Sequence, residues 1–244
     1  AVEVTKLSLL LKCMEGETGS SITAEMRFGE RVLPTLDNNI KSGNSLVDMD
    51  FYDGQLNFEP GVEKKVKPFS WQQAFPKIFK QGGFDAVIGN PPYVRIQTLK
   101  DISPESVAYF NKYFKTSLYG NYDLYVLFIE KALSILNRKG KSGFILPNKF
   151  FNTDYGIGVR ELIANRNHLE TIIDFGSHQV FANATTYCCL LFLNAGENKI
   201  FNYIKIDPLQ LLDNQTLKFE KLSCEKYSKN VWSFNNQNTD NLIE

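Results

Sequence analysis

The residues best suited to chemistry are Asn90, Pro91, Pro92 and Tyr93, which directly follow an apolar run of strand length at residues 84–89. The two prolines restrict the backbone and carry no N–H group, so the turn is stiff and its carbonyl groups point outward. The side-chain carbonyl of Asn90 and a main-chain carbonyl of Asn90 or Pro91 could accept both hydrogens of an exocyclic amino group. Tyr93 could then stack on the ring that carries this group. A plain strand terminator is the alternative interpretation, because Asn-Pro is a common turn.

The elements around this turn must position it. The apolar run at residues 84–89 is typical of a strand buried on both faces of a parallel sheet. Further strands are predicted over residues 142–147, 169–176 and 185–194, and helices over 103–114, 122–140 and 158–165. Strands that alternate with helices in this way indicate a doubly wound α/β sheet. Ligands bind beyond the carboxyl ends of the strands in such a sheet, which is where the turn must lie.

The composition is that of a globular domain with a substantial core. The chain has 244 residues, 43% of them hydrophobic, and its 27 basic and 27 acidic side chains balance, so no overall charge indicates a nucleic-acid partner. The four cysteines lack the spacing of a zinc site or a disulfide framework, and no metal site is predicted. Cys188 and Cys189 alternate across a predicted strand and are expected in the core. No segment has the length of a membrane span or the features of a signal peptide, so a cytoplasmic location is expected.

In order and spacing, several blocks resemble the γ-type N6-adenine DNA methyltransferases of restriction-modification systems, especially the type II and IIG enzymes. "NPPY" at residues 90–93 resembles the (D/N/S)-P-P-(Y/F) signature of that family. "GNSL" at 43–46 resembles the loop after its third strand, and "DLYVLFIEKAL" at 123–133 resembles the helix that walls the cofactor pocket. "QVFANATTYCCLLFL" at 179–193 resembles the block with a second aromatic residue. The resemblance covers roughly residues 1–195.

The resemblance implies a Rossmann-like fold and methyl transfer from S-adenosylmethionine to the N6 amine of an adenine flipped out of double-stranded DNA. Hydrogen bonds to the amine that strengthen as positive charge develops on its nitrogen would favour the transition state, and no metal or covalent enzyme intermediate is needed. The implied site comprises the catalytic residues Asn90, Pro91, Pro92 and Tyr93, the stacking pair Tyr93 and Phe181, and the cofactor contact Asn44. Phe181 also suits a core position and Asn44 a turn.

Two segments depart from the family pattern. The glycine-rich loop for the methionine part of the cofactor, and the acidic residue for its ribose, are not recognisable. The first two strands are therefore expected to be missing, and this chain alone to be inactive. Residues 1–195 are predicted to form the carboxyl-terminal portion of the methyltransferase domain, and 196–244 a linker or the start of a target-recognition domain. We expect a partial sheet in which the strands near residues 84, 142, 169 and 186 still pair.

Two other functions remain open at this stage. Methyltransferases that act on glutamine side-chain amides in proteins share an N-P-P-Y loop, although the block at residues 180–187 and the long insertion between Asn44 and Phe84 argue against that assignment. A non-catalytic DNA-binding subunit of a defence complex is the third possibility, and the intact "NPPY" argues against it. The expected partners are double-stranded DNA with a flipped adenine and a fused or associated restriction nuclease with its target-recognition domain.

Overall fold

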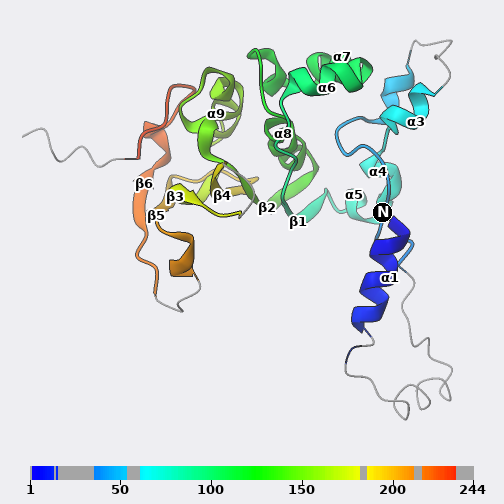
Figure 1. The fold of residues 1–244 in the computed structure, drawn as a ribbon. Helices are drawn as coiled ribbons and strands as arrows, with labels where there is room; N and C mark the ends of the chain where they lie inside the picture. Colours follow the sequence, from blue (N-terminus) through cyan, green and yellow to red (C-terminus); the bar gives the residue numbers. More distant parts are fainter. Residues whose placement is uncertain are drawn as a thin grey trace, which may run out of the picture.

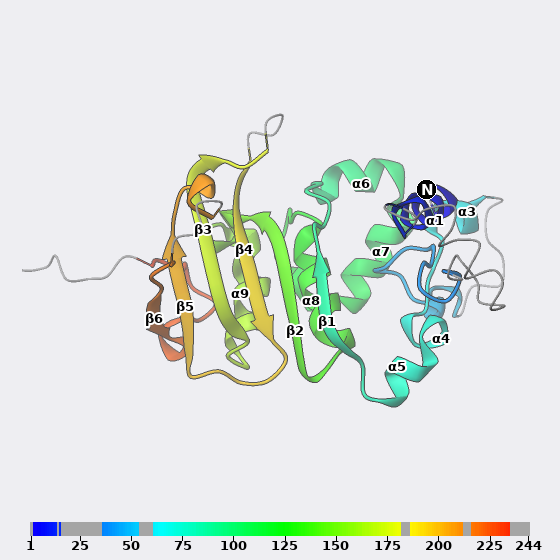
Figure 2. The same cartoon turned by 90° about the horizontal axis from the view of Figure 1, so that it is seen from below.

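The computed structural model describes residues 2–13, 15, 36–53, 61–181, 186–211 and 216–234. Its centre is a six-stranded mixed sheet with the strand order β1-β2-β4-β3-β5-β6 (Figures 1 and 2). The strands are β1 (Phe84–Gly89), β2 (Leu136–Pro147), β3 (Leu169–Gln179), β4 (Tyr187–Asn194), β5 (Ile200–Lys205) and β6 (Glu220–Ser223). β1 runs parallel to β2, and β3 runs parallel to β5. β4 is antiparallel to both β2 and β3, and β6 is antiparallel to β5.

Helices surround this sheet unevenly. The α-helices are α1 (Val2–Cys13), α3 (Val62–Val66), α4 (Trp71–Ala74), α5 (Pro76–Lys80), α6 (Ile96–Ile102), α7 (Pro104–Tyr113), α8 (Tyr125–Ile135) and α9 (Ile157–Ala164). Short 3-10 helices are η1 (Met49–Tyr52), η2 (Lys115–Leu118), η3 (Asn148–Phe151), η4 (Asp154–Gly156), η5 (Pro208–Leu211) and η6 (Cys224–Lys226). Helices α6 to α9 lie on one side of the sheet (Figure 1), whereas the side seen in Figure 2 shows β1, β2 and β4 without a covering helix among the described residues.

The core lies between the sheet and the α8 layer. α8 is apolar on most of its circumference, and Tyr125, Val126, Leu127 and Ile129 are fully buried. Such a helix is stabilised chiefly by packing on several sides, here against β2, α9 and η2. Cys188 and Cys189 are fully buried in β4, so their predicted core placement is confirmed.

The predicted α/β class is confirmed, and so is the pairing of the strands near residues 84, 142, 169 and 186. The helix predicted over residues 122–140 ends at Ile135, because Leu136 already pairs with Phe84 in the sheet. The sheet continues past residue 195 through β5 and β6. The functional division at residue 195 stays a prediction.

The expectation that residues 84–89 are buried on both faces is wrong. β1 pairs only with β2 among the described residues and forms the edge of the sheet. The side chain of Ile88 is 85% exposed as a result. An apolar run indicates a strand that suits burial, but the pattern cannot tell which neighbours are present.

The segment after β6 folds back onto the helical side. The N–H group of Trp232 donates to the carbonyl oxygen of Phe151 at 2.8 Å, and the two rings stack with centroids 6.1 Å apart. The buried guanidinium of Arg160 fixes the same segment by a hydrogen bond to the carbonyl oxygen of Lys229 at 2.9 Å. Within the described residues, no helix is both long enough and apolar enough to cross a membrane.

Candidate functional site

The turn at residues 90–93 lies where sequence reasoning places it, directly beyond the carboxyl end of β1. The pairing of β1 with β2 ends at Gly89 opposite Phe144, and the chain then leaves the sheet. A Cβ atom on Gly89 would lie 3.2 Å from the Phe144 ring, so the absence of a side chain allows a close approach. Asn90 is exposed and accessible to a ligand, Pro91 is buried and Tyr93 is half-buried.

Tyr93 is held from two directions. Its hydroxyl donates a hydrogen bond to the carbonyl oxygen of Ile145 in β2 at 3.0 Å. Its ring meets the fully buried ring of Tyr125 edge-on, with centroids 6.3 Å apart. Tyr125 in turn shares a hydrogen bond of 3.1 Å with Tyr155, whose hydroxyl donates to Asp123 at 3.2 Å. Burial raises the pKa of the Tyr93 hydroxyl, which therefore stays a neutral donor across the physiological range.

Phe181 and Tyr93 belong to the same apolar cluster, although they are 88 positions apart in the sequence. The buried members of this cluster are Ile173, Phe175, Cys188 and Ile206, and both aromatic side chains pack against it while remaining partly exposed. Residues 182–185, which complete the block around Phe181, lie outside the described residues. The structure thus brings the two predicted stacking residues to one region, and their stacking role stays a prediction.

Asn44 occupies a turn. Its side-chain oxygen accepts a hydrogen bond from the N–H group of Leu46 at 3.1 Å, and its own N–H group donates to Lys67 at 2.7 Å. The next residue, Ser45, lines the cavity beside the turn at residues 90–93, whereas Asn44 is not among the lining residues. The alternative interpretation of Asn44 as a turn residue therefore fits the geometry, and its predicted cofactor contact stays a prediction.

A cavity of about 220 Å³ opens beside Asn90. Its lining comprises Ser45, Trp71, Val87, Ile88, Gly89, Asn90, Pro91, Pro92, Phe128, Lys131, Ala132, Ile135 and Phe144. The indole N–H group of Trp71 donates to the carbonyl oxygen of Ser45 at 3.0 Å and so fixes the segment at residues 43–46 against α4. The lining is predominantly apolar, with a few polar groups near the turn, as is typical of small-molecule sites.

Of these lining residues, sequence reasoning named only Asn90, Pro91 and Pro92 as site residues, and those it missed include Ser45, Trp71, Phe128 and Lys131. Phe128 and Lys131 had a usable signal, since they lie three positions apart on the helix that resembles the wall of the cofactor pocket and therefore share a face. Ser45 lies in the "GNSL" block next to Asn44, which was a usable signal as well, whereas Trp71 reaches the cavity only through tertiary contacts that no local pattern reveals.

Lys131 is the charged residue of this lining. Burial lowers the pKa of its ammonium group, while the charges of Asp48, Asp50 and Glu130 act in the opposite direction. The same side chain borders a second hollow of about 370 Å³, which Asp48 and Asp50 also line. The hydroxyl of Tyr109 donates to Asp50 at 2.6 Å there and accepts from the N–H group of Asp48 at 3.1 Å. Lys131 therefore lies between the cavity at the turn and the hollow that the acidic residues Asp48 and Asp50 line.

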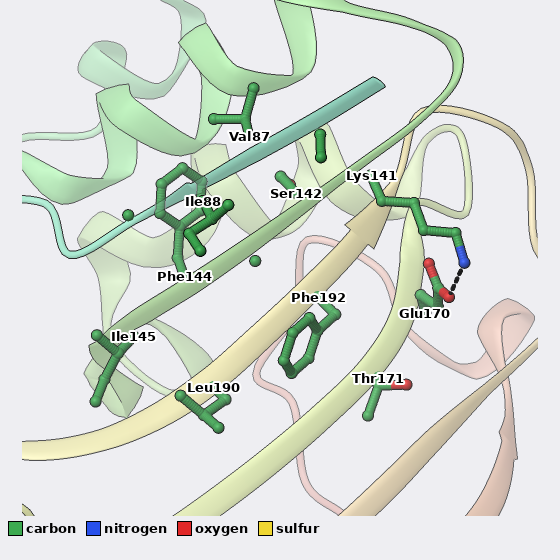
Figure 3. A pocket seen from close by; sticks show the side chains of 13 residues that line it. Val87, Ile88, Lys141, Ser142, Phe144, Ile145, Glu170, Thr171, Leu190 and Phe192 are labelled. Atoms are coloured by element: carbon green, nitrogen blue, oxygen red, sulfur yellow. Dashed lines mark hydrogen bonds and ion pairs between the residues drawn. The ribbon is translucent and has the colours of Figure 1, made fainter. Parts of the chain in front are cut away.

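A larger hollow, of about 570 Å³, lies on the uncovered side of the sheet (Figure 3). It crosses β1, β2, β4 and β3 and is mostly apolar, with Ile88, Phe192 and Leu190 among its lining side chains. The ion pair between Lys141 and Glu170, 2.5 Å apart, borders it. This hollow contains none of the predicted site residues, whereas Asn90, Pro91 and Pro92 line the smaller cavity at the turn.

Comparisons with known proteins agree on one family. Residues 1–181 match the family described as Eco57I restriction-modification methylase. RM.Eco57I from Escherichia coli, a type II restriction enzyme and methyltransferase, is 35% identical over 206 residues, which are 84% of this chain and 19% of that protein. The type II methyltransferase M.HincII from Haemophilus influenzae is 28% identical over 185 residues, which are 74% of this chain and 37% of that protein.

Among solved structures, a nuclease-deletion mutant of the Type ISP restriction-modification enzyme LlaGI, in complex with a DNA substrate mimic, superposes with a TM-score of 0.45. It is 22% identical, and the match covers 62% of this chain and 18% of that chain. The chain spans about a fifth of the length of RM.Eco57I. Because the family match covers most of the sequence, the chain belongs to the Eco57I restriction-modification methylase family.

Proposed function

We propose that this chain forms the target-amine side of the active site in an adenine-specific DNA methyltransferase of a restriction-modification system. The observation that carries the proposal is the stiff turn at residues 90–93, which combines an exposed amide, Asn90, with an aromatic ring, Tyr93, whose orientation is fixed. The family assignment supports methyl transfer as the reaction. The N6 amine of adenine as the acceptor is our inference from the acceptor groups of the turn.

The chemistry follows from the nature of the acceptor. The lone pair of the N6 nitrogen is delocalised into the adenine ring, which makes this nitrogen a poor nucleophile. Asn90 accepts one amine hydrogen through its side-chain oxygen, and a carbonyl of the Asn90–Pro91 main chain accepts the other. As the nitrogen gains positive charge these two hydrogen bonds strengthen, so they stabilise the transition state more than the bound substrate.

Base stacking supplies the positioning. An adenine can be reached by this turn only when it is flipped out of the double helix. Tyr93 and Phe181 border one apolar cluster, and each would contribute on the order of 1–3 kcal/mol by stacking on the flipped base. Because Tyr93 is already held by Ile145 and Tyr125, little side-chain freedom is lost when the base binds.

The cavity beside the turn suits part of the methyl donor. Its volume of about 220 Å³ is below the range typical of a whole drug-sized ligand, so it would hold a ring rather than the complete cofactor. Pro92 and Phe128 offer apolar walls for such a ring, and Ser45 and Lys131 offer polar groups at its rim. Bound there, S-adenosylmethionine would supply an electrophilic methyl group. We also propose Asn44 as a contact to this cofactor, because it precedes the lining residue Ser45 in the sequence.

The whole protein is expected to act on double-stranded DNA in the cytoplasm. RM.Eco57I is a restriction enzyme as well as a methyltransferase, which supports a nuclease as a fused or associated partner. The resemblance in sequence also implies a target-recognition domain in the whole protein. Residues 196–244 would form the linker to this domain or its first part.

Methyl transfer tests the proposal directly. The full-length protein that carries this chain is incubated with labelled S-adenosylmethionine and unmethylated DNA, and the modified nucleosides are identified by mass spectrometry. We expect N6-methyladenine, and we expect it to be lost in Asn90→Ala. The product should be retained in Asn137→Ala, because Asn137 lies at the amino end of β2, away from the turn at residues 90–93. Label on cytosine would contradict the adenine assignment. Label on protein glutamine, or a folded, cofactor-binding protein that transfers no label, would favour the two alternative functions.

A further inference from the structure

Among the described residues, strand β2 pairs on one side only beyond Phe144. β1 pairs with β2 as far as Gly89 and then turns away, whereas β4 continues to pair with β2 as far as Pro147. Pro147 has no N–H group, so the last position of this ladder lacks a donor. The carboxyl end of β2 therefore needs restraints from side chains.

One restraint comes from the catalytic turn itself. The hydroxyl of Tyr93 donates to the carbonyl oxygen of Ile145, which lies just past the last residue that β1 reaches. The contact works in both directions. It gives the Ile145 carbonyl a partner, and it makes the position of the Tyr93 ring depend on the position of β2 at residue 145.

The second restraint joins β2 to β3 across the first residues of β4. The side-chain amide of Asn148, the residue after Pro147, donates to Asp174 at 2.9 Å and to the carbonyl oxygen of Gly176 at 3.2 Å. β4 lies between β2 and β3, so this one side chain connects the end of β2 with the middle of β3, two strands that are not adjacent in the sheet.

Asp174 is itself well anchored. It is only 8% exposed, and its carboxylate also accepts hydrogen bonds from the N–H group of Gly176 at 2.9 Å and from the hydroxyl of Tyr203 at 3.4 Å. Gly176 has a φ angle of +57°, which a residue without a side chain adopts readily and which lets its N–H group turn back to the carboxylate. Asp174 is thus a fixed point to which Asn148 ties β2.

We propose that Asn148 and Asp174 are positioning residues, which hold the carboxyl end of β2 and through it the ring of Tyr93. The sequence of contacts runs from Asp174 to Asn148, along three residues of β2 to Ile145, and from the Ile145 carbonyl to the Tyr93 hydroxyl. That the positioned ring stacks on a flipped base rests on the proposed function. The mechanical coupling itself does not, and it can be measured without DNA or cofactor.

Fluorine NMR of the chain labelled with 3-fluorotyrosine provides the measurement. The chain has 11 tyrosines, and the Tyr93 resonance is identified by its loss in Tyr93→Phe. We expect Asn148→Ala to move and broaden this resonance, while the line of Tyr119, whose hydroxyl donates to Glu161 in α9, stays in place. Asn148→Asp, which sets a second carboxylate against Asp174, should displace it further.

Asn137→Ala is the matched control. Asn137 lies at the amino end of β2, and its side-chain amide donates to the carboxylate of Asp85 at 2.6 Å. Asn137→Ala therefore removes a hydrogen bond between an amide and a carboxylate at the end of β2 that is far from Tyr93. An unmoved Tyr93 resonance in folded Asn148→Ala would overturn the inference and leave the proposed methyl transfer intact. If Asn148→Ala does not fold, Asn148→Leu, which keeps the approximate side-chain size but cannot donate to Asp174, gives the same test with the same expected shift.

Discussion

The hydroxyl of Tyr93 lies 3.0 Å from the carbonyl oxygen of Ile145 and donates a hydrogen bond to it. This contact ties the turn after β1 to a part of β2 that β1 no longer reaches. A phenylalanine at position 93 would satisfy base stacking equally well, so the hydroxyl has a separate task. It fixes the ring and gives a partner to a carbonyl group at the edge of the sheet.

Tyr93→Phe and Tyr93→Ala should therefore separate the two tasks. Tyr93→Phe leaves the Ile145 carbonyl without its partner and should lower the free energy of unfolding by about 1 kcal/mol in urea titrations. In the full-length protein it should still methylate DNA, whereas Tyr93→Ala, which also loses the stacking surface, should be far slower. Tyr113→Phe is the control, because Tyr113 is 41% exposed and its change should leave stability unaltered. Equal methylation by the alanine and phenylalanine variants would argue against stacking by Tyr93.

The site could be predicted in part because some of its signals are local. The strand, the two prolines and Tyr93 follow one another in the chain, so the spacing alone places the turn at the carboxyl end of a strand. The cavity beside it is assembled from residues up to 99 positions apart, and only the helical spacing of Phe128 and Lys131 hinted at a shared wall. Ser45 and Trp71 meet through one hydrogen bond between side chain and backbone, which composition cannot reveal.

The fold shows the same division between local and non-local information. Strands and helices were predicted from periodicity, and the pairing of four strands followed from the expected sheet. The exposure of Ile88 was not predicted, because an apolar run indicates what a strand could bury but not which elements cover it. Likewise β5 and β6 extend the sheet beyond residue 195, where sequence composition gave no sign of continuity.

Ile88 provides a second prediction, on association. It is 85% exposed on the open edge of β1, and such an edge invites pairing with other chains. Ile88→Lys should change the free energy of unfolding by no more than about 0.5 kcal/mol. It should also reduce self-association of the isolated chain in sedimentation velocity. Ile172→Lys, at a fully buried position of β3, should prevent folding. A strongly destabilised Ile88→Lys would show that Ile88 is covered in solution.

Arg160 is expected to be a major determinant of stability. Its guanidinium is only 2% exposed and donates to the carbonyl oxygens of Phe150 at 2.6 Å, Thr153 at 2.8 Å and Lys229 at 2.9 Å. Arg160→Met keeps an apolar stem but leaves three carbonyl groups without this partner, at a cost of about 3 kcal/mol or more in the free energy of unfolding. Arg166→Met, at an exposed position just after α9, serves as the control and should be neutral. Equal urea midpoints for the two variants would contradict the prediction.

Lys131 should give stability a distinctive pH dependence. Burial lowers the pKa of its ammonium group below the ordinary value of 10.5, so the unfolded chain holds this proton more tightly than the folded chain does. Between the lowered and the ordinary pKa the unfolded state binds more protons, and the contribution of Lys131 to stability therefore rises with pH. Lys131→Met removes the cost of burying the charge, so its advantage over the parent chain should be greatest near neutral pH. That advantage should shrink as the pH rises toward 10.5.

Urea midpoints of the two chains, measured from neutral pH upward, provide the check, with the exposed Lys139→Met as the control. A difference that stays constant with pH would mean that Lys131 carries its charge equally well in the folded and unfolded states.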